Sequence, residues 1–251
     1  MASLPRGFTR KKSGNRKAAL LLHGMSSSPW EMSLLSTVLS RSGWDVFCPL
    51  LANFNSWEGR FNGFSWEYWF NAAQQALGPM KGRYRRTAVV GTSLGGVLAG
   101  LLCARNPWLG PAVMVNPPFR YRGFLVRCAL LLPGLFRRIP VRVAPQFKEY
   151  YFPYFPIQAV RELREMALEA MKAAPQVRQP VLVYYTRNDR TISESGIVKY
   201  LNSVPAGIRK MRTVEKGPHS LLAPSFKNNN VIADGILQFI ETAPLPRNTS
   251  L

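Results

Sequence analysis

Thr87-Ala-Val-Val-Gly-Thr-Ser-Leu-Gly-Gly96 is the stretch that decides the fold this sequence predicts. It opens with apolar and β-branched residues, which are typical of a strand buried on both faces. It then passes through Gly91-x-Ser93-x-Gly95 into a segment of small and apolar residues, 94–104, that has helix character. On so sharp a turn the serine stands clear of the sheet, and side chains two positions away on either side would collide. We therefore expect Ser93 to be a nucleophile on an elbow that requires Gly91 and Gly95. The alternative is a chance pair of glycines around a serine.

Short apolar segments alternate with longer amphipathic segments on both sides of this turn. The pattern predicts strands at residues 18–22, 45–49, 87–90, 112–115, 181–185 and 211–214, and helices at 30–40, 67–77, 94–104, 160–173, 194–201 and 231–240. Strands that alternate with helices indicate a parallel sheet with right-handed crossovers. The expected fold class is therefore α/β, with a mostly parallel central sheet flanked by helices.

This regularity breaks after Pro117 and returns near residue 177. The intervening segment is aromatic, basic and punctuated by prolines before it becomes helical. We interpret it as an inserted helical cap. The expected organisation is a basic N-terminal arm (1–16), an α/β core (17–116 and 177–243), a cap or lid (117–176) and a C-terminal tail (244–251).

A serine nucleophile needs a base, and the sequence contains only two histidines, His23 and His219. His219 follows the last expected strand and precedes the last expected helix. Loops after parallel strands meet at one edge of the sheet, so this loop can deliver an imidazole to Ser93. The alternative is an ordinary surface histidine.

The base in turn needs an orienting acid. Of the three aspartates, Asp189 lies in the loop after the expected strand 181–185, which gives the chain order Ser, Asp, His. Asp189 could instead cap the helix that starts near Ser193 or pair with Arg190. Glu194 and Glu215 are weaker substitutes for the acid.

Two backbone amides are candidates for an oxyanion hole. Leu94 stands at the start of a helix, where the dipole favours developing negative charge. Met25 follows His23-Gly24 at the end of the first expected buried strand, and its amide is the second candidate donor. The alternative for this segment is a plain His-Gly turn.

Taken together, His23-Gly24, Gly91-x-Ser93-x-Gly95, Asp189 and His219 resemble the α/β-hydrolase superfamily, and in particular its small bacterial carboxylesterases and monoacylglycerol lipases. The resemblance spans about residues 17–243. It implies an α/β-hydrolase fold with a cap and a Ser93–His219–Asp189 triad. It also implies an acyl-enzyme mechanism on carboxylic esters that requires no metal or organic cofactor. An acyltransferase or thioesterase on the same triad is the alternative.

Aromatic residues suggest where the substrate binds. They cluster in the segment 53–69 and in the expected cap, and we select Phe54, Trp57 and Phe124 as substrate-binding residues. So apolar a pocket favours an acyl or lipid ester over a sugar or peptide. The alternative is that some of these aromatics belong to the core.

The chain is strongly basic, with 33 Lys and Arg against 13 Asp and Glu, a net charge of +20. Residues 1–17 and 116–148 each carry clustered cations and no acid. The segment 124–138 mixes cations with aliphatic residues, which suggests the hypothesis that it rests on an anionic membrane surface. The alternative is a core-packed helix with a solvated basic rim. No nucleic-acid reader module is recognisable, so we expect no specific nucleic-acid partner.

Targeting signals are not evident. The basic N-terminus is not followed by a signal-type apolar region, and the apolar stretch 124–136 falls short of the ~20 residues that span a bilayer. The three cysteines form no C-x-x-C motif, so neither a disulfide framework nor a zinc site is indicated. We expect a cytoplasmic protein, with a peripheral membrane location as the alternative.

Overall fold

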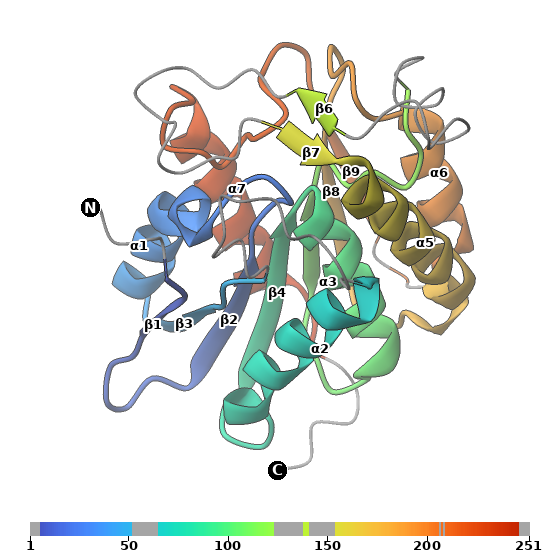
Figure 1. Ribbon diagram of the computed structural model, residues 1–251. Coiled ribbons are helices and arrows are strands. Elements are labelled where there is room, and N and C mark those ends of the chain that lie inside the picture. The colour runs from blue at the N-terminus through green and yellow to red at the C-terminus, as the bar shows by residue number, and fades with distance from the viewer. Residues whose placement is uncertain are drawn as a thin grey trace.

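The computed structural model describes residues 6–51, 65–122, 138–140, 154–205, 207 and 209–245. Its centre is a seven-stranded sheet in the order β1-β3-β2-β4-β5-β8-β9 (Figure 1). Strand β1 runs antiparallel to β3, and the other neighbouring pairs are parallel. The expected mostly parallel α/β fold is therefore confirmed. The strands are β1 (Phe8–Arg10), β2 (Lys17–Leu22), β3 (Trp44–Cys48), β4 (Arg86–Thr92), β5 (Ala112–Val115), β8 (Val181–Thr186) and β9 (Arg209–Val214).

Helices cover both faces of this sheet (Figure 1). One face packs against α1 (Ser33–Arg41) and α7 (Asn229–Thr242). The other packs against α2 (Trp66–Leu77), α3 (Leu94–Arg105), α5 (Ile157–Ala173) and α6 (Glu194–Ser203). Short 3-10 turns η1 (Pro29–Met32), η2 (Gly78–Met80) and η4 (Ala174–Gln176) complete the described helical elements. None of the described helices is long and apolar enough to cross a membrane.

Alternating side chains explain why the central strands are apolar throughout. In β2, Leu20 and Leu22 pack in the cluster that includes α3, whereas Leu21 packs with α1 and α7. A strand between two helical layers has no solvent face, so it reads as a continuous apolar run. Helix α3 is buried at every position from Leu94 to Ala104, as expected of a helix that is apolar on all sides.

The register of the sheet brings the loops of interest together. Leu22 pairs with Gly91 across β2 and β4, so the chain after β2 leaves the sheet beside the elbow after β4. Thr186 pairs with Val214 across β8 and β9, so the loops that follow these strands also start side by side. Parallel strands thus deliver four loops to one edge of the sheet.

Three short strands were not predicted from the sequence. Strand β1 lies within the expected N-terminal arm, where it forms the antiparallel edge of the sheet. Strands β6 (Arg138–Pro140) and β7 (Tyr154–Pro156) form an antiparallel pair of their own within the expected cap. Figure 1 shows this pair at the top, the end of the molecule at which β4 and β8 finish.

Helix α5 also refines the expected cap. Its apolar residues Val160, Leu163 and Ala167 belong to the same hydrophobic cluster as α2 and α3, so this helix is part of the layer that covers the sheet. The cap at residues 117–176 stays our proposal, and α5 is the part of it that packs on the core. Most of the segment 124–138, on which the membrane-surface hypothesis rests, lies outside the described residues.

Candidate active site

Ser93 occupies the turn between β4 and α3. Its backbone angles are φ 52° and ψ −116°, a conformation that a residue other than glycine rarely adopts. The strain is held by packing and by a hydrogen bond in which the Ser93 amide donates to the Val115 carbonyl over 2.8 Å. The side chain is half-buried, and Oγ makes no hydrogen bond to another described residue.

Gly91 and Gly95 make this turn sterically possible. A Cβ atom on Gly91 would collide with the carbonyl oxygen of Gly95, and one on Gly95 would collide with that of Leu22. These neighbours are backbone atoms, so a rotamer change cannot relieve either clash. The requirement for glycine two positions before and after Ser93 is therefore set by backbone crowding.

Asp189 and His219 come from the loops after β8 and β9. The His219 Nδ1 atom donates to the Asp189 carboxylate over 2.5 Å. The other carboxylate oxygen accepts from the amides of Thr191, at 2.7 Å, and Ile192, at 3.4 Å. Asp189 thus organises its own loop and binds the imidazole at the same time. Its side chain is buried, whereas that of His219 is 29% exposed.

The two groups shift each other's pKa. Burial alone would raise the pKa of Asp189, but the His219 hydrogen bond, its charge and the two amides hold it below its ordinary value. Burial alone would lower the pKa of His219, but the Asp189 hydrogen bond and charge, with a smaller contribution from the charge of Glu31, raise it. An imidazole in this position is a stronger base than a free histidine.

If His219 is the base, the pH dependence of activity should report this shift. A general base must be neutral, so kcat/KM should rise with pH as His219 loses its proton. Because the His219 pKa is raised, we expect the midpoint of this acid limb above the ordinary histidine value of about 6.5. Initial rates on a soluble ester from pH 5 to pH 9, fitted to one ionisation, would measure it. A midpoint well below 6.5 would argue against His219.

Asn116 stabilises the candidate site through buried hydrogen bonds, and it was not predicted from the sequence. It is fully buried, follows β5 directly and has a positive φ of 46°. Its amide group donates to the Thr186 hydroxyl at 3.0 Å and to the His219 carbonyl at 2.7 Å. Its carbonyl oxygen accepts from the Thr186 amide at 2.8 Å. Asn116 therefore ties the ends of β5 and β8 to the loop that carries His219.

His23 fixes the turn that follows β2. Burial lowers its pKa to about 4, so the ring is neutral. The Leu51 amide donates to Nε2 over 3.1 Å, which leaves the proton on Nδ1 to donate to the Gly24 carbonyl over 2.8 Å. The Ser27 amide donates to the same carbonyl. The peptide bond between Gly24 and Met25 is thereby held in one orientation.

The amides of Met25 and Leu94 lie at the two segments that border Ser93. Neither donates a hydrogen bond to another described residue, so both are free to bind a ligand. The Gly24 segment is close to the nucleophile, because a Cβ built on Gly24 would lie 3.5 Å from the Ser93 Cβ. Leu94 is the first residue of α3. Both amides are thus placed as candidate oxyanion donors.

Glu31 is a second residue that the sequence did not single out. It lies in η1 and is fully buried, and its Oε2 accepts a hydrogen bond from the Gly24 amide over 2.9 Å. A Trp-Glu-Met segment at a helix start gives no signal of a buried carboxyl. The candidate substrate residues Phe54, Trp57 and Phe124 lie outside the described residues.

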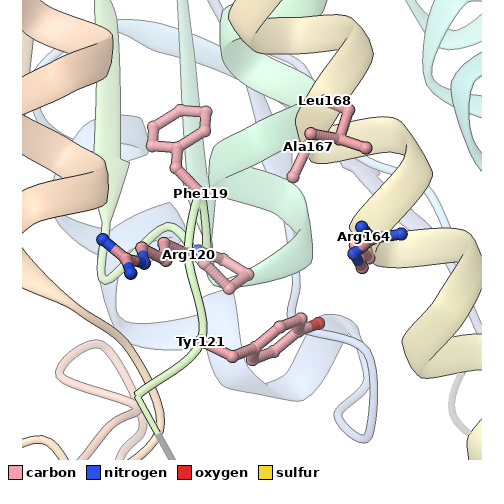
Figure 2. Close-up of a pocket in the computed structure, with 7 residues that line it drawn as sticks. Phe119, Arg120, Tyr121, Arg164, Ala167 and Leu168 are labelled. Carbon is pink, nitrogen blue, oxygen red and sulfur yellow. The ribbon is translucent and has the colours of Figure 1, made fainter. Parts of the chain in front are cut away.

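A cavity of about 240 Å³ is lined in part by residues that contact the loop of Asp189, although Ser93, Asp189 and His219 do not line it (Figure 2). It lies between the segment after β5 and helix α5, and Tyr121 in its wall pairs with Ile192 in the loop of Asp189. The Tyr121 hydroxyl is buried without a hydrogen-bond partner among the described residues. The lining residues are Pro118, Phe119, Arg120, Tyr121, Arg164, Ala167 and Leu168.

Comparison with known proteins defines the class to which this fold and site belong. The model of the alpha/beta hydrolase family matches residues 19–226, so the chain belongs to the α/β-hydrolase family. The predicted resemblance is thereby confirmed. In a search of curated proteins no sequence matches.

Solved structures share the fold at low sequence identity. A structure reported for the metagenome-derived lipolytic enzymes LipS and LipT has a TM-score of 0.83 at 20% identity and covers 95% of this chain and 98% of its own. The monoacylglycerol lipase of Paleococcus ferrophilus has a TM-score of 0.75 at 14% identity, with 93% and 98% coverage. A soluble variant of monoglyceride lipase from Saccharomyces cerevisiae has a TM-score of 0.72 at 14% identity, with 96% coverage of both chains.

Proposed function

We propose that this protein hydrolyses carboxylic esters through an acyl-enzyme on Ser93, with His219 as base and Asp189 as its orienting acid. The observation that carries the proposal is the 2.5 Å pair between Asp189 and His219, which two strand-end loops bring to the edge of the sheet that bears the strained Ser93. The names of the structurally similar lipases add support.

In the first half-reaction, Ser93 Oγ attacks the ester carbonyl carbon while His219 Nε2 takes the hydroxyl proton. Asp189 holds the Nδ1 proton, so Nε2 is the free acceptor, and its negative charge stabilises the imidazolium that forms. The carbonyl oxygen becomes an anion that the Met25 and Leu94 amides bind. His219 then donates the proton to the departing alkoxide, which leaves as an alcohol.

In the second half-reaction, water attacks the acyl group on Ser93. His219 takes a proton from the water, the same amides bind the second oxyanion, and the C–O bond to Ser93 breaks. His219 returns the proton to Ser93 Oγ, and the carboxylic acid leaves. Every step uses side chains and amides of this chain, and no cofactor is required by the scheme.

The cavity beside the site suggests the size of the acyl group. Its volume of about 240 Å³ is below the roughly 300–1,000 Å³ of typical small-molecule sites. Phe119, Ala167 and Leu168 make much of its wall apolar. We infer that this cavity accepts a short to medium acyl chain.

The proposal is tested with p-nitrophenyl esters of increasing acyl length, from acetate to palmitate, and purified protein. We expect hydrolysis of the shorter esters, a maximum at short to medium chain length, and a fluorophosphonate probe bound at Ser93. A folded protein that hydrolyses no ester and does not react with the probe would overturn the proposal.

Narrowing the cavity should change chain-length preference more than overall activity. Leu168 lines the cavity and is 41% exposed, so Leu168→Trp adds volume there without overpacking the core. We expect kcat/KM on octanoate to fall by roughly tenfold relative to acetate, because a lost apolar contact of one or two methylenes is worth about that much. Val198→Trp on α6, with 39% exposure and no place in the cavity wall, is the matched control. An unchanged ratio would show that the acyl chain binds elsewhere.

A further inference from the structure

Gly24 is held from both sides. Its carbonyl oxygen accepts from His23 Nδ1 at 2.8 Å and from the Ser27 amide at 3.2 Å, and its amide donates to Glu31 Oε2 at 2.9 Å. Its two peptide units therefore have fixed partners in opposite directions. A glycine has wider φ and ψ freedom than any other residue, so these bonds replace the restraint that a side chain would supply.

The orientation of these peptide units determines where the Met25 amide points. In a trans peptide the N–H lies opposite the C=O, so the bonds to the Gly24 carbonyl aim the Met25 N–H in the other direction. The bond from Glu31 fixes the preceding peptide unit, and with it the remaining rotation at Gly24. The Gly24 segment borders Ser93, so small rotations here displace a donor at the reacting carbonyl.

We propose that Glu31 is a positioning residue of the oxyanion hole, an inference that rests on the proposed function. Its buried carboxyl accepts a hydrogen bond from the Gly24 amide. This bond keeps the Met25 amide directed at the carbonyl that Ser93 attacks.

The surroundings of Glu31 favour a hydrogen-bonding role over a charged one. Burial raises the pKa of Glu31, and the Gly24 amide, Ser220, His219 and Ser27 lower it by less. His219 is the titratable group whose charge acts on Glu31, and Glu31 in turn helps to raise the pKa of the buried Cys48 thiol. Its second oxygen, Oε1, has no hydrogen-bond partner among the described residues, which is an unfavourable place for a negative charge.

Two substitutions separate the hydrogen bond from other effects. Glu31→Gln keeps a carbonyl oxygen for the Gly24 amide and is never charged, whereas Glu31→Leu has a similar size and no acceptor. We expect Glu31→Gln to keep kcat within about twofold and to move the acid limb of the pH profile only slightly to lower pH, because the charge of Glu31 is the smallest of the contributions that raise the pKa of His219. We expect Glu31→Leu to lower kcat by roughly 10- to 100-fold with KM within about twofold, because oxyanion donors act mainly in the transition state.

The control is Glu169→Gln on α5, which removes the same charge from a residue that pairs with Lys172 near the surface. It should match the wild type in kcat and pH profile. A Glu31→Leu enzyme as active as the wild type, or a Glu31→Gln enzyme as impaired as Glu31→Leu, would overturn the positioning role.

Hydrogen exchange at the Gly24 amide gives a readout that needs only folded protein. We expect this amide to be protected in the wild type and in Glu31→Gln, and to exchange at least about tenfold faster in Glu31→Leu, while amides in β4 are unchanged. Equal protection in Glu31→Leu would overturn the proposed contact. If the protein hydrolyses no ester but shows the expected exchange pattern, the contact between Glu31 and the Gly24 amide is supported and the proposed function is contradicted.

Discussion

Ser93→Ala is expected to lower kcat on p-nitrophenyl esters by a factor of about 10⁴ or more, because it removes the atom that forms the acyl-enzyme. Binding should survive, since the amides of Met25 and Leu94 and the cavity are untouched, so a substrate analogue should bind with nearly unchanged affinity. The measurement is a steady-state assay beside equilibrium binding of a non-hydrolysable analogue.

The fold should tolerate this change. The bond from the residue 93 amide to the Val115 carbonyl uses the backbone alone, and alanine is no larger than serine. We expect the thermal midpoint to move by no more than a few degrees. Ser203→Ala, at the exposed end of α6, removes a hydroxyl that bonds the Lys199 carbonyl and serves as the control. Substantial turnover by pure Ser93→Ala protein would mean that another group is the nucleophile.

The elbow could be predicted from sequence because its cause is local. The crowding of Gly91 and Gly95 arises from backbone within a few residues and from β2 alongside, and it restricts both positions to one residue type. Helix α3, which follows the elbow, could also be predicted from the sequence, because burial on all sides requires apolar residues from Leu94 to Ala104. A structural feature can be predicted from sequence when a single physical requirement restricts a position to one type of residue.

Other elements depend on partners far away in the chain. Strand β1 is three residues in a basic segment, and its strand character comes from pairing Thr9 with Phe47. Asn116 bonds residues 70 and 103 positions further along. Nothing in the residues next to Asn116 reveals these contacts.

The buried carboxyl of Glu31 is another feature that residues nearby in the sequence do not predict. At the start of an amphipathic segment an acid is ordinarily assigned to the solvent face and the helix dipole. Its burial follows from the fold, which places η1 beneath the turn after β2. Helix α5 shows a related dependence, because its sequence pattern is clear while its packing beside α3 depends on tertiary structure.

Asp189→Asn should have the second-largest effect, with kcat lower by about 10⁴. An asparagine keeps the shape, but its amide cannot stabilise the imidazolium as a carboxylate does. If its NH₂ faces Nδ1, it also forces the ring proton onto Nε2, the atom that must accept the proton of Ser93. Steady-state kinetics against Asp234→Asn, an exposed change of the same kind on α7, would measure the effect.

The residual activity of Asp189→Asn should also have a shifted pH profile. The Asp189 hydrogen bond and charge are what raise the His219 pKa against the opposing effect of burial, so without them that pKa falls. The acid limb of kcat/KM should therefore move to lower pH while the plateau drops. A reduced plateau with an unmoved limb would mean that the limb reports a group other than His219. Near-normal activity would assign the orienting role to a different acid, for which Glu194 and Glu215 are the candidates from the sequence.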